Sequence, residues 1–159
     1  AGFLAAVFFV ASLVHVPVGA ASAHLVMNGL LGMLLGPAAC PAIFAALLLQ
    51  AVLFQFGGLT VLGVNTATLG LGAVAAWLAW RGLRALLPAR RGLAAWAAGF
   101  TGVAASSVLT AGALALSGEG FAAAAGALLV SNLPVMIAEG FVTLFAAGFL
   151  ARMRPDLLP

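Results

Sequence analysis

Apolar runs alternate with short breaks of glycine, proline or charged residues along the whole chain. The runs cover residues 2–16, 20–35, 37–56, 59–81, 94–116 and 121–152. Most of them approach the roughly 20 residues that an α-helix needs to cross the hydrocarbon core of a bilayer. The pattern therefore predicts an all-α fold, a polytopic integral membrane helical bundle of about six transmembrane helices. These helices are expected to form a single membrane-embedded, substrate-binding domain over residues 1–159.

Two of the runs differ from a simple span. Segment 20–35 is too short at about 1.5 Å per residue, so we expect a partial or tilted element that reaches in from an outer loop. Segment 121–152 is too long, and we expect Pro134 to divide it. The first residues contain neither an initiator Met nor a basic region, so the N-terminal part of the protein is expected to be missing from this sequence.

The composition agrees with a membrane location. With 6% charged and 65% hydrophobic residues, the chain cannot cover a water-facing surface, and lipid must cover it instead. All six basic residues are arginines in two clusters at the ends of apolar segments: Arg81, Arg84, Arg90 and Arg91, then Arg152 and Arg154. Arginines in such positions mark the cytoplasmic side. Two crossings between the clusters then place Glu119 outside. Counting backwards places Gly57-Gly58 outside, Gly36-Pro37 inside and residues 17–24 outside.

Several function classes are excluded by what the chain lacks. It has no lysine, so it cannot contain a Walker-type phosphate loop and does not hydrolyse ATP itself. Its single aspartate, Asp156, is in the predicted cytoplasmic tail, far from both predicted outer histidines, so no nucleophile–base pair supports an enzyme. Cys40 is the only cysteine, which excludes an internal disulfide. The arginines are membrane-edge anchors, so we expect them to contact the lipid bilayer and not nucleic acid.

The predicted outer side carries the residues most suited to metal binding. His24 ends a loop of small residues near a predicted helix start, and neutral imidazole is the commonest metal ligand in proteins. The alternative is a histidine that makes only local hydrogen bonds at the membrane surface. Ser22 lies in the same loop, and His15 lies at the outer end of the first run. Both are candidates to line a pocket, although His15 also fits an ordinary interfacial position.

Three further polar residues are candidates for the same pocket. Asn65 ends a glycine-rich turn on the outer face, which either lines a pocket or simply joins two helices. Glu139 lies at membrane depth, where carboxylates are costly and usually face the protein interior. It is predicted to act as a polar tether between helices, as a proton or cation site, or as a contact for a partner subunit. Asn132, two helical turns earlier, is a candidate for the same lining.

Taken together, these segments resemble a known family. The runs VPVGAASAHL (16–25), LGP (35–37), QAVLF (50–54), GGLTVLGVN (57–65) and LPVMIAEGFVT (133–143), with the tail RMRPDLL (152–158), are similar in sequence and order to the CbiM/NikM family. This family is the cobalt/nickel substrate-binding subunit of energy-coupling factor transporters. The tail is more similar to the cobalt branch.

The resemblance implies a membrane subunit of the bacterial cytoplasmic (inner) membrane that captures cobalt or nickel as its transported substrate. It implies a transmembrane coupling protein, two cytoplasmic ATPase subunits and a small accessory membrane subunit as partners. His24 matches the internal histidine ligand of the family, whose other ligands come from the extreme N-terminus. The resemblance implies that these ligands surround the ion with a planar set of nitrogens, which suits nickel(II) or low-spin cobalt. Asn132 stands where many relatives are expected to have histidine.

Two other functions are compatible with the residues alone. The chain is alternatively an ion- or proton-coupled secondary transporter with Glu139 as its titrating group, which predicts transport by this chain without partners. The third hypothesis is a structural membrane subunit without a ligand, in which loss of His24 leaves metal uptake unchanged.

Overall fold

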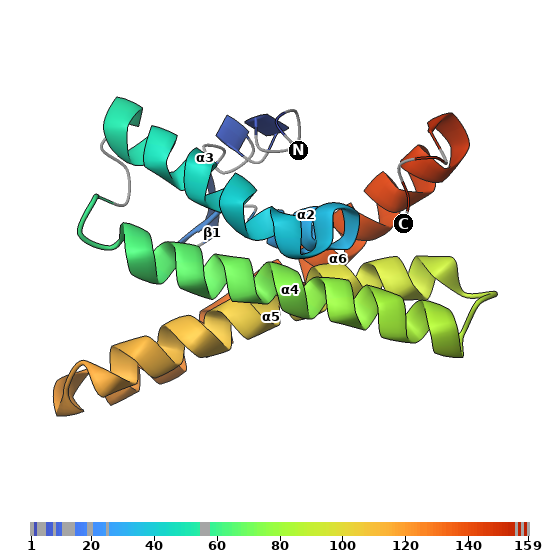
Figure 1. Ribbon diagram of the computed structural model, residues 1–159. Coiled ribbons are helices and arrows are strands. Elements are labelled where there is room, and N and C mark those ends of the chain that lie inside the picture. The colour runs from blue at the N-terminus through green and yellow to red at the C-terminus, as the bar shows by residue number, and fades with distance from the viewer. Residues whose placement is uncertain are drawn as a thin grey trace.

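The computed structural model describes residues 2, 6–7, 9–10, 15–18, 21–24, 26–54, 58–154, 156 and 158. After helical residues at positions 2, 6–7 and 9–10 comes a short antiparallel hairpin, formed by strands β1 (His15–Val18) and β2 (Ala21–His24). Helices follow in the order α2 (Asn28–Leu35), η1 (Gly36–Ala38), α3 (Ala39–Phe54), α4 (Leu62–Leu86), α5 (Arg91–Leu116), η2 (Glu119–Phe121) and α6 (Ala122–Met153). Figure 1 shows them as an elongated bundle, and strand β2 of the hairpin packs against α6.

The all-α membrane class is confirmed, but the expected number of helices is wrong. Within the described residues, four helical stretches are long and apolar enough to cross a membrane: Asn28–Phe54, Leu62–Leu86, Arg91–Leu116 and Ala122–Met153. The expected runs 20–35 and 37–56 share the first of these stretches, because Pro37 lies in the first turn of the short helix η1 that joins α2 to α3. Of the expected run 2–16, residues 2, 6–7 and 9–10 are helical and residues 15–16 belong to strand β1, while the others lie outside the described residues.

The first stretch is bent where α2 meets α3. The amide of Asn28, at the start of α2, lies 3.5 Å from the carbonyl oxygen of Leu69 in α4. By Gly36 the chain has advanced along α4 to the indole of Trp77. It then reverses, and the first turn of α3 lies beside Gly70. Gly36 has a φ of 58°, a left-handed conformation that glycine adopts without steric cost, so this residue permits the reversal. α2 is thus the partial element that the short run predicted.

The expected division of the last helix at Pro134 is also wrong. α6 continues through Pro134 as one helix of 32 residues. Proline removes one backbone hydrogen bond, but in lipid a broken helix would leave many more polar groups unsatisfied, so transmembrane helices tolerate it. At about 1.5 Å per residue the helix is roughly 48 Å long. It must therefore tilt or extend beyond the hydrocarbon core.

Glycines let the helices approach until their backbones touch. A Cβ on Gly32 of α2 would lie 2.0 Å from the carbonyl oxygen of Ala73 in α4. A Cβ on Gly99 of α5 would lie 2.4 Å from the carbonyl oxygen of Glu139 in α6. Neither position can hold a larger residue without moving a helix. Close approach through small residues is the usual way in which helices associate in lipid.

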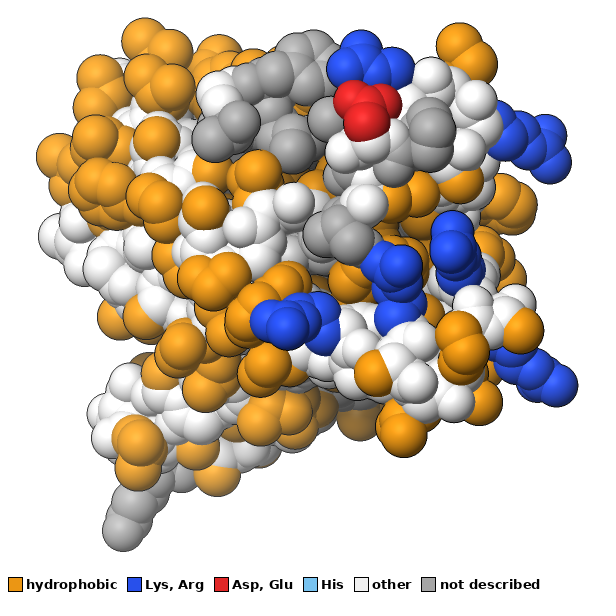
Figure 2. All heavy atoms as spheres, turned by 45° about the vertical axis from the view of Figure 1, so that its right-hand side comes forward, with side chains coloured by type: hydrophobic (Ala, Val, Ile, Leu, Met, Phe, Trp, Pro, Cys, Tyr) orange, Lys and Arg blue, Asp and Glu red, His pale blue; other side chains and the backbone are white. Residues whose placement is uncertain are grey.

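The two ends of the bundle differ in charge. The α4–α5 turn and the C-terminal end of α6 lie together on the right of Figure 1, and the α3–α4 and α5–α6 turns lie on the left. The right side carries both arginine clusters, and we call it the arginine end. Figure 2 shows these arginine side chains spread over that side of the molecule. The expected grouping of the two clusters on one side agrees with this arrangement.

Candidate functional site

The hairpin carries the two histidines and Ser22. In its register His15 is opposite His24, and Pro17 is opposite Ser22. His24 is thus the last residue of strand β2, and helix α2, near whose start the sequence placed it, begins at Asn28. The side chains of His15, Ser22 and His24 lie outside the described part of the chain, so their predicted roles as ligand and pocket lining stay predictions.

Glu139 holds the chain that follows His24. This side chain is 0% exposed, in the middle of α6. Its Oε1 accepts hydrogen bonds from the backbone N–H groups of Val26 and of Met27, the latter at 2.8 Å. Strand β2 also packs against α6. Of the roles considered for Glu139, the geometry matches the tether, which connects α6 to the segment between His24 and α2.

The start of α2 explains why a carboxylate is needed there. Met27, the N-cap residue, has a φ of 49° and offers no side-chain acceptor. A left-handed conformation costs a non-glycine residue about 1–2 kcal/mol, and N–H groups at a helix start lack partners within the helix. Glu139 supplies the acceptor from a residue 112 positions away, and its negative charge is favoured near the positive end of the helix dipole.

A second buried polar cluster, which sequence reasoning missed, surrounds Asn28. Asn28 is 0% exposed, and its amide donates to the Ser106 hydroxyl at 2.6 Å and to the Gly102 carbonyl at 3.2 Å. The hydroxyl of Ser106 in turn lies 3.1 Å from the Thr68 carbonyl. The cluster joins α2, α4 and α5 beside the Glu139 tether. The available signal was a lone asparagine within an apolar run, which in a membrane protein needs a buried partner.

The remaining predicted residues lie nearer the end opposite the arginines. Asn132 of α6 donates to the hydroxyl of Ser107 in α5 at 3.0 Å, and so links these two helices. Asn65 lies in the first turn of α4, where its backbone carbonyl accepts a hydrogen bond from Thr68 at 3.2 Å. The structure thus brings Glu139 to the strand of His24 and ties Asn132 to α5. Within the described residues, no three His, Cys, Asp or Glu side chains form a metal-binding group.

Comparison with known proteins shows the family of this chain. Residues 1–157 match the CbiM family, described as the cobalt uptake substrate-specific transmembrane region. The chain belongs to this family. A cobalt transport protein CbiM from Sorangium cellulosum is 37% identical over 99% of this chain and 74% of its own length. A fused nickel transport protein NikMN from Rhodobacter capsulatus is 34% identical, over 98% of this chain and 51% of its own length.

The fold is also known from crystallography. A structure described as a transition metal transporter superposes with a TM-score of 0.81, covering 96% of this chain and 74% of that one at 24% identity. The CbiM-family chain is therefore a substrate-specific membrane component of cobalt/nickel uptake and not an enzyme. The predicted family, the transport class and the absence of an enzymatic role are confirmed.

Proposed function

We propose that this CbiM-family chain is the substrate-binding subunit of an energy-coupling factor importer in the bacterial inner membrane. It captures a divalent transition metal on the outer face, with His24 as a ligand. The observation that carries the proposal is the Glu139 tether, which holds the backbone directly after His24 at Val26 and Met27. A ligand on a fixed backbone is held in position before the metal arrives, which favours selective binding.

One imidazole does not complete a metal site. We propose that the further nitrogen ligands, which the resemblance assigns to the extreme N-terminus of the protein, close around His24. Ser22, His15, Asn65 and Asn132 are proposed to line the pocket. The hydrogen bond from Asn132 to Ser107 supports this for α6, because it fixes the side chain two turns from Glu139.

Cobalt is the proposed preferred substrate. Support comes from the family description, which names cobalt uptake, and from the CbiM relatives. Simple affinity of nitrogen ligands favours nickel(II) over cobalt(II), so a preference for cobalt must come from geometry or from metal availability. Uptake of labelled cobalt measured against increasing nickel tests this choice directly.

Release into the cell is proposed to require partners. The chain has no lysine and hence no phosphate-binding loop of the Walker type, so ATP hydrolysis belongs to two ATPase subunits. A transmembrane coupling protein and a small accessory membrane subunit complete the proposed transporter. The arginines mark the side on which the ATPases bind.

The decisive experiment replaces His24 by Gln in the full-length protein. We expect cobalt affinity, measured by calorimetry on purified protein, to fall by more than about a hundredfold, because a direct ligand matters more than its supporting residues. His15→Gln, on the opposing strand, is the matched control and should change affinity by about tenfold or less. Unchanged affinity in His24→Gln would overturn the proposal in favour of a structural subunit.

A second measurement separates this function from a proton-coupled transporter. Liposomes that contain only this chain should not accumulate cobalt under a pH gradient, whereas liposomes with all subunits and ATP should.

A further inference from the structure

Two neighbouring cavities open at the arginine end, away from the proposed metal site. The larger, of about 520 Å³, is lined by Trp77, Trp80, Arg81, Arg84 and Ala85 at the end of α4. The smaller, of about 180 Å³, lies between α4, the start of α5 and the C-terminal half of α6. Trp80 and Arg84 line both cavities, and Arg91 joins them in the smaller one. Three arginines thus line two cavities that share Trp80 and Arg84.

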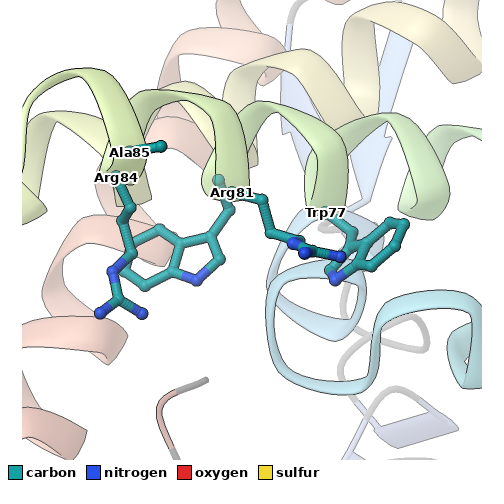
Figure 3. Close-up of a pocket in the computed structure, with 5 residues that line it drawn as sticks. Trp77, Arg81, Arg84 and Ala85 are labelled. Atoms are coloured by element: carbon teal, nitrogen blue, oxygen red, sulfur yellow. The ribbon is translucent and has the colours of Figure 1, made fainter.

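Two of these guanidinium groups are held by tryptophan rings. The Cζ of Arg81 lies 4.9 Å from the ring centroid of Trp77, and that of Arg84 lies 5.2 Å from the ring of Trp80. Figure 3 shows Arg81 and Arg84 on the cavity side of α4, with Arg81 against Trp77. Stacking uses the face of a guanidinium and leaves the N–H donors at its edge available. The donors at these edges are therefore available to an oxyanion.

None of the three arginines has an acidic partner in the part of the chain that the structure describes. The sequence contains only three acidic residues. Glu139 is bound to backbone N–H groups near α2, and Asp156 pairs with Arg154 at 3.0 Å. Glu119 begins η2 beyond the far end of α5, about 39 Å away at 1.5 Å per residue. The positive charge of the cavities is thus not neutralised from within these residues.

We propose that these cavities form a binding site for the phosphate group of an anionic phospholipid. The position fits, because arginine and tryptophan concentrate at the level of the headgroups, and basic pockets between transmembrane helices bind acidic headgroups. The neighbouring surface of α6 fits as well. Phe145 and Phe149, next to the cavity residues Leu144 and Gly148, are 71% and 64% exposed and provide an apolar track for acyl chains. An acidic segment of a protein would not need that track.

The test measures lipid binding to the full-length protein by native mass spectrometry, with cardiolipin and with phosphatidylcholine. We expect cardiolipin to be retained more strongly, and Arg84→Gln to reduce its affinity by about tenfold, the effect of losing one charged hydrogen bond. Arg81→Gln, at an exposed position, should act in the same direction. Arg152→Gln removes the same charge from the same end, outside both cavities, and should change affinity by about twofold or less.

A competition experiment identifies whether the bound phosphate belongs to a lipid or is free in solution. Inorganic phosphate at millimolar concentration should fail to displace cardiolipin, since it lacks the acyl chains. Displacement by phosphate, or equal losses in Arg84→Gln and Arg152→Gln, would overturn the site. The proposal also fails if Arg84→Gln leaves cardiolipin affinity unchanged while it weakens binding of the coupling protein. Lipid binding is measured without metal, so the outcome does not depend on the proposed metal site.

Discussion

The region around the start of α2 and the arginine end accommodate their charged groups in opposite ways, the first by burial and the second by exposure. Near α2 the single carboxylate, Glu139, is completely buried and is held by backbone N–H groups. At the arginine end most charges stay at the surface, and Arg154 and Asp156 form an exposed ion pair. Burial makes each polar contact near α2 energetically important, since an unpaired group there cannot turn to water. Solvent and headgroups make individual contacts at the arginine end replaceable.

The largest expected difference between the two regions is the effect on stability of replacing a glycine by alanine. Gly32→Ala places a Cβ 2.0 Å from the carbonyl oxygen of Ala73 and should destabilise the protein by about 3 kcal/mol or more. Gly82→Ala, at the arginine end, meets no atom within 4 Å and should be neutral or stabilising by about 0.5–1 kcal/mol. Thermal unfolding in detergent, followed by tryptophan fluorescence, compares the two. Equal stability of both variants would contradict the close contact of α2 with α4.

The next largest effect is expected when the buried acid near α2, Glu139, is changed to its amide. Glu139→Gln removes the charge that binds Val26 and Met27 while keeping a similar shape. We expect a loss of about 2 kcal/mol in stability, because a buried hydrogen bond to a charged group is lost. We also expect weaker cobalt binding, by about tenfold, if Glu139 positions His24.

A double substitution shows whether Glu139 acts through His24. In the His24→Gln background, Glu139→Gln should still lower the unfolding temperature but should cause no further loss of cobalt affinity. An equal loss of affinity in both backgrounds would mean that Glu139 contacts the metal site independently. If affinity falls in neither background, the tether serves the fold alone.

The smallest effect is expected for Asp156→Asn. The guanidinium of Arg154, hydrogen-bonded to Asp156, holds the pKa of this carboxyl below its usual range. A lowered pKa in the folded state adds stability above the unfolded pKa, and that contribution is lost as the pH falls toward the folded value. Both partners are exposed, so the unfolding temperature at neutral pH should not change measurably. A shift as large as that of Glu139→Gln would show that the tail packs on the bundle.

The sequence predicted those features that each residue determines locally. Lipid excludes charge wherever a helix crosses it, so the arginines by themselves indicated the membrane class and the end on which both clusters lie. The family was likewise recognisable from short runs in order. The expected division at Pro134 failed because the prediction treated proline as in water, where a broken helix can bond to solvent.

The tertiary structure decided what depends on residues distant in sequence. The partner of Glu139 is a backbone 112 positions away, and the reversal at Gly36 joins two expected runs in one helical stretch. Asn28 and Ser106 meet only because glycines let three helices touch. Hydrophobic periodicity records which residues avoid water, but in a bilayer every helix face is apolar, so the pattern cannot specify which faces meet. Packing and buried hydrogen bonds make that choice.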